Sequence, residues 1–130
     1  MNQPAQLQTG PASSTLIRSF GAARMAIGAA TWLAPSLATR AFGLGASAEQ
    51  PIVGQLFGAR EFVLGALTAS GSGAALRAGI AIDGADTVAS LRNMRAGAFS
   101  TQAKLLVAAG AATFTGIGLA ALAMEDSGAA

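Results

Sequence analysis

Residues 54–68 read GQLFGAREFVLGALT, and this stretch decides the fold that we expect. Gly54, Gly58, Glu61, Gly65 and Thr68 follow one another at intervals of four, three, four and three residues, which places them on one face of a helix. Glycines at such intervals let two helix backbones approach closely, and Gly54 with Gly58 forms a GxxxG motif. The stretch therefore predicts a helix over about 52–71 whose packing face carries a carboxylate.

Two other stretches carry small residues at the same helical spacing. Over about 74–91 the stripe includes two carboxylates and consists of Gly79, Asp83, Asp86 and Ser90. Over about 105–124 it is uncharged and consists of Ala109, Ala112, Gly116, Ala120 and Ala123. We expect helices to pack against one another at the glycines of these stripes, namely Gly54, Gly58, Gly65, Gly79 and Gly116.

The composition indicates a membrane protein. Hydrophobic residues make up 52% of the 130 residues and charged residues only 11%, whereas about 25% of the residues of a soluble domain are charged. Leu105 to Met124 is an uncharged run of twenty residues, which is about the length that crosses a bilayer as a helix.

We predict an all-α fold, an antiparallel bundle of four transmembrane helices. The expected spans are about 19–37, 52–71, 74–91 and 105–124, within one membrane domain over 15–126. Residues 1–14 have no charged side chain and are rich in Gln, Pro, Ser and Ala, so we expect a disordered polar tail there. Pro35 either kinks the end of the first span or starts a short helix at the membrane interface.

Six charged residues of cancelling sign lie inside the apolar stretches, namely Arg24, Arg60, Glu61, Arg77, Asp83 and Asp86. One unpaired charge near the bilayer centre costs roughly 2.5 to 3.5 kcal/mol, so we expect these side chains to pair. The antiparallel helix directions predict two clusters, one of Glu61 with Arg24 and Arg77, and one in which Arg60 bridges Asp83 and Asp86. A guanidinium suits such a bridge because its planar fork can bind two carboxylates.

The charged residues leave three classes of role open. Paired charges can fix helix register, because a partner left alone penalises misassembly. They can instead line an ion or proton path, as intramembrane carboxylates do in transporters. Asp83 and Asp86, three residues apart, could also hold Mg²⁺ against a phosphate. They match half of the CDP-alcohol phosphotransferase signature, but Thr87 stands where that family has glycine, and its second Asp pair is absent.

The chain has no Cys and no His, which excludes disulfides, thiolate nucleophiles, Ser-His triads and axial-histidine haem. We expect no cofactor, no metal site and no enzymatic activity. The net charge of +2 comes from dispersed arginines rather than a basic run, so we expect no nucleic-acid binding. Lipid headgroups are the expected partners of these arginines.

The order of features resembles the small four-helix bacterial membrane proteins of the DUF4267 and DoxX-like type. The features are Arg24 before Gly28 and Pro35, then Phe42-Gly43, then Phe57-Gly58-Ala59-Arg60-Glu61 with Gly65, then Arg77 with Asp83 to Asp86. The resemblance covers about residues 18–124. It implies a four-helix integral membrane protein without assigned chemistry, and some DoxX-like members are associated with respiratory or redox partners.

Together these observations predict a structural or accessory subunit of a larger membrane complex or homo-oligomer, surrounded by the lipid bilayer and by other membrane subunits or copies of itself. The alternative is a small proton- or ion-linked transporter that uses the intramembrane charges. Seven arginines against one lysine are typical of a GC-rich bacterial genome. Together with the four expected spans, this ratio predicts a multi-pass protein of the bacterial inner membrane. The distribution of Arg and Lys favours termini outside.

Overall fold

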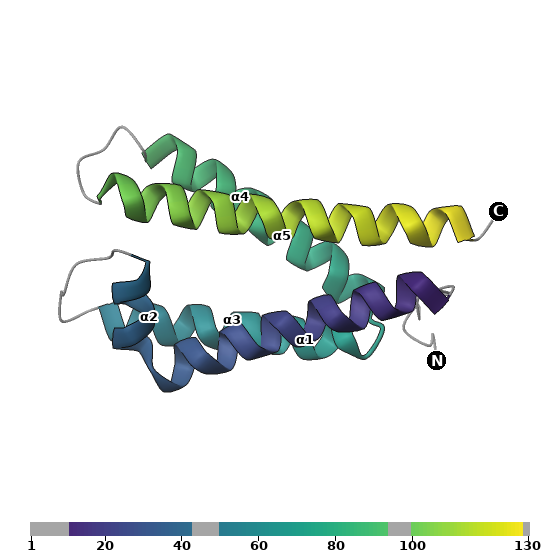
Figure 1. Ribbon diagram of the computed structural model, residues 1–130, viewed down its shortest axis with the longest axis horizontal. Coiled ribbons are helices and arrows are strands. Elements are labelled where there is room, and N and C mark those ends of the chain that lie inside the picture. The colour runs from purple at the N-terminus through teal and green to yellow at the C-terminus, as the bar shows by residue number, and fades with distance from the viewer. Residues whose placement is uncertain (1–10, 43–49, 94–99, 129–130) are drawn as a thin grey trace.

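The computed structural model describes residues 11–42, 50–93 and 100–128, and the all-α class is confirmed for them. Its helices are α1 (Pro11–Leu33), α2 (Pro35–Ala41), α3 (Gln50–Ala69), α4 (Gly73–Asn93) and α5 (Thr101–Gly128). The four long helices alternate in direction along the chain, so the start of α1 and the end of α5 lie at the same end of the molecule (Figure 1). The short helix expected after the first long one is α2.

Both ends of α1 differ from the expected boundaries. The helix begins at Pro11, so residues 11–14 are helical rather than part of a disordered tail, and residues 1–10 lie outside the described residues. Proline suits the first turn of a helix, where its missing N–H is not needed. The helix ends at Leu33 rather than at residue 37, because Pro35 disfavours helical backbone at Ala34, whose φ is −132°. A Cβ built at Gly54 would lie 3.3 Å from the Cβ of Pro35, which places α2 against α3.

The turn between α3 and α4 is a glycine-dependent helix cap. Gly71 has a φ of 87°, its N–H donates to the carbonyl of Thr68, and the N–H of Ser72 donates to the carbonyl of Leu67. These two bonds are the Schellman arrangement, which requires the left-handed conformation that glycine adopts freely. The hydroxyl of Ser72 then caps α4 by accepting from the N–H of Ala75 at 3.2 Å.

The pair α1–α3 is held at very short range by four glycines. A Cβ built at Gly28 would lie 2.6 Å from the carbonyl oxygen of Gly58, and one at Gly58 would lie 2.7 Å from that of Gly28. Gly21 and Gly65 oppose each other in the same reciprocal way, at 2.7 and 2.6 Å. Any side chain at these positions would meet backbone, so the two helices touch along their main chains. Gly58 and Gly65 therefore pack as we predicted.

An internal repeat explains this reciprocity. Residues 20–31 read FGAARMAIGAAT and residues 57–68 read FGAREFVLGALT, and six of the twelve positions are identical. The repeat places Gly21 and Gly28 of α1 in the positions that Gly58 and Gly65 occupy on α3. Because the two copies run antiparallel, the contact of Gly21 with Gly65 and that of Gly28 with Gly58 are related by an approximate two-fold axis.

The second helix pair, α4–α5, packs through a different face of α5 from the one we expected. A Cβ at Gly116 would meet nothing within 4 Å, and the whole predicted stripe of Gly116 and its neighbouring alanines is exposed. The packing glycine is Gly118, whose Cβ would lie 2.6 Å from the side chain of Ile80. Our prediction of packing at Gly116 is therefore wrong for this chain, because α5 turns its larger side chains, including Phe114 and Ile117, toward the core.

The two pairs meet in an apolar cluster near the terminal end of the bundle. Its buried members come from α1, α4 and α5 and are Ile17, Phe20, Leu76 and Ala121. Among the described helices, two are long and apolar enough to cross a membrane, over Pro51–Ala69 within α3 and Thr101–Met124 within α5. These correspond to two of the four expected spans.

The glycine contacts predict opposite effects for one substitution at two sites. Gly65→Ala should lower the free energy of unfolding by about 1–3 kcal/mol, because the added Cβ meets backbone that has no side-chain freedom to yield. Gly116→Ala, the matched control, should be neutral or slightly stabilising, because alanine is the better helix former and the site is open. Denaturant titration of helicity in mild detergent measures both, and equal effects would contradict the packing described.

Candidate functional site: a buried network of five charged side chains

Arg24 lies in the middle of α1 and is the largest side chain fully buried in the described structure, with 1% of its surface exposed. The rings of Phe20 and Phe114 lie 5.5 and 5.2 Å from its guanidinium carbon, within the range of cation–π attraction. Gly79 makes the space on α4, since a Cβ there would lie 3.2 Å from Nη1 of Arg24. Gly79 thus acts as the predicted packing glycine, but it packs against an arginine rather than against backbone.

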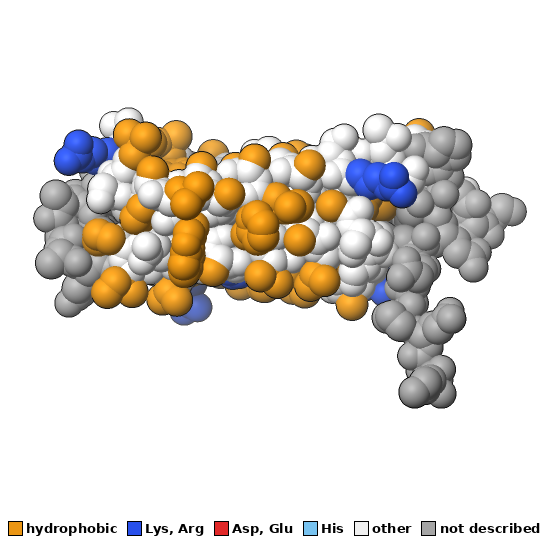
Figure 2. All heavy atoms as spheres, turned by 90° about the horizontal axis from the view of Figure 1, so that it is seen from below, with side chains coloured by type: hydrophobic (Ala, Val, Ile, Leu, Met, Phe, Trp, Pro, Cys, Tyr) orange, Lys and Arg blue, Asp and Glu red, His pale blue; other side chains and the backbone are white. Residues whose placement is uncertain are grey.

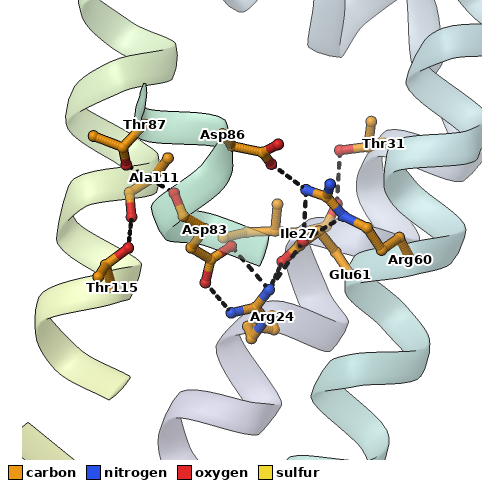
Figure 3. Close-up of polar contacts among 10 residues, drawn as sticks. All are labelled: Arg24, Ile27, Thr31, Arg60, Glu61, Asp83, Asp86, Thr87, Ala111 and Thr115. Atoms are coloured by element: carbon orange, nitrogen blue, oxygen red, sulfur yellow. Dashed lines mark hydrogen bonds and ion pairs between the residues drawn. The ribbon is translucent and has the colours of Figure 1, made fainter. Parts of the chain in front are cut away.

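The guanidinium of Arg24 joins three helices. Nη1 donates to Oδ2 of Asp83 at 2.5 Å and Nη2 donates to Oδ1 of Asp83 at 3.2 Å, which is a forked contact with α4. Nη2 also donates to Oε1 of Glu61 on α3 at 3.0 Å. Glu61 is 1% exposed and Asp83 is 3% exposed. Figure 3 shows the three side chains converging from α1, α3 and α4.

Arg60 extends the network outward. Its Nη2 donates to Oδ2 of Asp86 at 2.7 Å and to Oε1 of Glu61 at 3.2 Å, and its Nε donates to the same Glu61 oxygen at 3.3 Å. The guanidinium carbon lies 5.0 Å from the centre of the Phe57 ring. The side chains of Arg60 and Asp86 are 32% and 37% exposed, so this end of the network reaches the molecular surface.

The five side chains do not balance in charge or in hydrogen bonds. Two guanidinium groups face three carboxylates, which gives a formal net charge of −1 when all are ionised. In the described part of the chain, two buried side-chain polar atoms have no hydrogen-bond partner, namely Nε of Arg24 and Oε2 of Glu61. The Glu61 oxygen does lie 2.9 Å from Nη2 of Arg24, so it has charge attraction without an aligned donor.

The structure brings together five of the six charged residues singled out in the sequence, in a different arrangement from the one expected. Glu61 meets Arg24, and Arg60 meets Asp86, but Asp83 binds Arg24 rather than Arg60. Arg60 therefore bridges Glu61 and Asp86, not the two aspartates. The sixth residue, Arg77, is exposed near the start of α4, and the ion pairs of the described residues do not include it.

Four residues of the site were not predicted: the α1 glycines Gly21 and Gly28, and Phe20 and Phe114, whose rings lie near Arg24. The signal for the glycines is the repeat, because Gly21, Arg24, Gly28 and Thr31 have the spacing of Gly58, Glu61, Gly65 and Thr68. The rings had no comparable signal, since contact of Phe20 with Phe114, at 5.5 Å between centroids, depends on how α5 docks on α1.

The chemistry that the site supports is ionic. The threonine hydroxyls near the network donate to carbonyls of their own helices, Thr31 to Ile27 and Thr87 to Asp83, so they are not aligned with a base. Asp83 and Asp86 turn to different arginines instead of facing a shared cation. Within the described residues, no group of three Asp, Glu, His or Cys side chains is placed to hold a metal ion.

Comparisons with known proteins identify no relative: no family model, no curated protein and no solved structure matches the chain.

Arg24 should be the most sensitive position of the network. Arg24→Leu should lower the free energy of unfolding by about 3–5 kcal/mol, because it leaves Glu61 and Asp83 buried without their main partner. Arg60→Leu should cost less, since the Arg60 side chain is one-third exposed, and Arg77→Leu should be close to neutral. The measurement is unfolding in detergent together with accumulation of tagged protein; an Arg77→Leu defect as large as that of Arg24→Leu would contradict this ranking.

Proposed function

We propose that this protein is a membrane-embedded helical subunit whose internal ion pairs fix its assembly, and that it acts as a structural or accessory part of a larger membrane complex or homo-oligomer. The observation that carries the proposal is the enclosure of Arg24, Glu61 and Asp83, each at most 3% exposed. Charges that are paired and shut off by packed helices define register and orientation, and they do not line a wet passage.

The proposal takes all four long helices as spans. Helices α1 and α4, of 23 and 21 residues, are about 34 and 31 Å long, enough for a hydrocarbon core of about 30 Å. Both helices carry more charged residues than an ordinary membrane span, but their central charges form ion pairs inside the bundle. Arg24 of α1 pairs with Asp83 of α4, and Asp86 of α4 pairs with Arg60. Such internal pairing is how ionised side chains are accommodated in a membrane.

The outer surface supports the same placement. Figure 2 shows one face on which hydrophobic side chains cover the middle, while Lys and Arg side chains lie mostly toward the two ends. Many large apolar side chains are at least half exposed, among them Leu33, Leu37, Ile52, Val53, Leu56, Val63, Val88, Leu91, Leu105 and Leu119. A soluble monomer rarely exposes so much contiguous apolar surface, whereas lipid or a partner subunit covers it at no cost.

The second candidate, proton- or ion-linked transport, is favoured by one observation. Arg60 and Asp86 are about one-third exposed, so the charge network is continuous from the buried centre to the surface.

The location in a bacterial inner membrane and the resemblance to DUF4267 and DoxX-like proteins stay predictions from the sequence.

Single cysteines test the number of spans, because the chain has no native cysteine. Ser70→Cys and Thr101→Cys introduce exposed thiols just before and just after the α4 segment. With four spans the two thiols lie on opposite sides of the membrane, and a membrane-impermeant maleimide added to intact cells or sealed vesicles labels one of them. If only α3 and α5 cross, the two thiols lie on the same side and label alike.

Purification tests the accessory role directly. Tagged protein extracted from its native membrane in gentle detergent should carry a stoichiometric partner or further copies of itself in native mass spectrometry. Arg77→Leu should leave this assembly intact, whereas Arg24→Leu should abolish it. A lone monomer from the native membrane would contradict the accessory role and favour transport.

A further inference from the structure

We propose that the exposed edge of the charge network docks a transmembrane helix of another protein, and that this helix carries one arginine at mid-membrane depth that binds Asp86. The docking surface consists of Arg60 and Asp86 together with the apolar side chains on either side of Arg60, Leu56 and Val63. The proposal rests on the membrane subunit proposed above, and it names the chemistry of the partner.

The depth of the ion pair between Arg60 and Asp86 is the first argument. Arg60 lies in the middle of α3, and Asp86 lies seven residues before the end of α4, about 10.5 Å along the helix axis. The exposed parts of these two side chains, 32% and 37%, therefore lie at the level of hydrocarbon when all four long helices span. Charged side chains at this depth turn away from lipid and toward polar groups. The ion pair is therefore a surface that another polar group covers.

The sign of the excess charge identifies that polar group. The network has two guanidinium groups and three carboxylates, so it lacks one positive charge. Among the described residues Asp86 receives one hydrogen bond, from Nη2 of Arg60 to Oδ2, whereas Asp83 is bonded at both oxygens (Figure 3). Asp86 is also the most exposed of the three carboxylates. A cation from outside therefore completes the network at Asp86.

The surroundings of the ion pair fit a helix rather than a small ion. Leu56 and Val63, four residues before and three residues after Arg60 on one face of α3, are 67% and 55% exposed. On α4, Ala89 follows Asp86 by three residues and is small and exposed, which allows a neighbouring backbone to approach. An apolar helix with one central cation matches this combination, because its apolar side chains cover Leu56 and Val63 while the cation reaches Asp86.

Arginine is the cation that we expect on this helix. Its guanidinium group keeps its charge in apolar surroundings, whereas a lysine ammonium group readily loses its proton there. The network itself uses the same pairing, since each of its three carboxylates accepts a hydrogen bond from a guanidinium group.

A second copy of this chain fits the surface less well. Two copies related by a two-fold axis along the membrane normal would bring two Asp86 side chains together at one level, and each copy would add its own excess carboxylate. The exposed arginines of α4 lie at other levels: Arg77 is nine residues before Asp86 and Arg92 is six residues after it, about 13.5 and 9 Å along the axis. Helix α4 of a second copy therefore presents no cation at the depth of Asp86, and Arg60 of that copy already has its own Asp86.

The experiment measures association of the full-length chain with model peptides in vesicles of neutral phosphatidylcholine. The protein carries a fluorescent acceptor at Ser70→Cys, outside the docking surface, and each leucine-rich transmembrane peptide carries a donor at one end. The central residue of the peptide is arginine, glutamine or leucine. The arginine peptide should bind the otherwise unmutated chain about tenfold more tightly than the leucine peptide. It should also bind more tightly than the glutamine peptide, which forms hydrogen bonds without a charge.

Two variants locate the contact. Asp86→Asn should remove the preference for the arginine peptide, because it removes the carboxylate that the arginine binds. Arg77→Gln, the matched control, alters a charge of the same helix outside the network and should keep the preference. Circular dichroism in the same vesicles checks that both variants retain the helicity of the unmutated chain.

Equal binding of the arginine peptide and either uncharged peptide to the unmutated chain would overturn the proposal, whatever the variants do. A preference that survives Asp86→Asn would also overturn it, because the arginine would then bind elsewhere. Energy transfer between two labelled copies that Asp86→Asn abolishes would assign the surface to a second copy instead.

Failure of this proposal is distinguishable from failure of the proposed function. A stoichiometric native partner with no basic residue in its spans would contradict the arginine contact and leave the accessory role intact. The thiol labelling tests the four spans without reference to any partner.

Discussion

The structure depends on the position of one guanidinium group. Arg24 is buried at the point where α1, α3 and α4 meet, and two carboxylates and two aromatic rings surround it there. The glycines of α1 and α3 bring the backbones close enough for Glu61 to reach it, and Gly79 leaves room for it on α4. The close approach of α1 and α3 at their glycines and the ion pair between Arg24 and Glu61 therefore depend on each other.

The network also joins two helix pairs that differ in how they pack. The pair α1–α3 touches along its backbones at glycines, whereas α4–α5 packs through side chains such as Ile80. Between the pairs, the apolar cluster around Phe20 and Leu76 lies toward the terminal end, and the ion pairs lie farther along the bundle. Losing the ion pairs would leave α4 attached to α3 mainly through the short turn at Gly71.

Spacing in the sequence predicted the packing face of α3 well and that of α5 wrongly. All five residues of the α3 stripe are buried, because glycines there alternate with large side chains and mark one face. On α5, small residues occur on every face, so spacing alone could not choose between Gly116 and Gly118.

The partner of Asp83 was predicted wrongly because the start of α1 was predicted wrongly. A helix that begins at residue 19 would place Arg24 near its end. The observed start at Pro11 puts Arg24 in the middle of α1, level with Asp83.

The ion pair between α1 and α3 resolves an ambiguity that the glycines leave. Gly21 and Gly28 are seven residues apart, as are Gly58 and Gly65, so sliding one helix by seven residues would still bring one glycine opposite another. That slip moves Glu61 by about 10.5 Å along the axis, far out of reach of Arg24. A slipped pairing would then separate the guanidinium of Arg24 from the carboxylate of Glu61 in an apolar interior, which disfavours the slip. The glycines bring the two helices into contact, and the charges select the register.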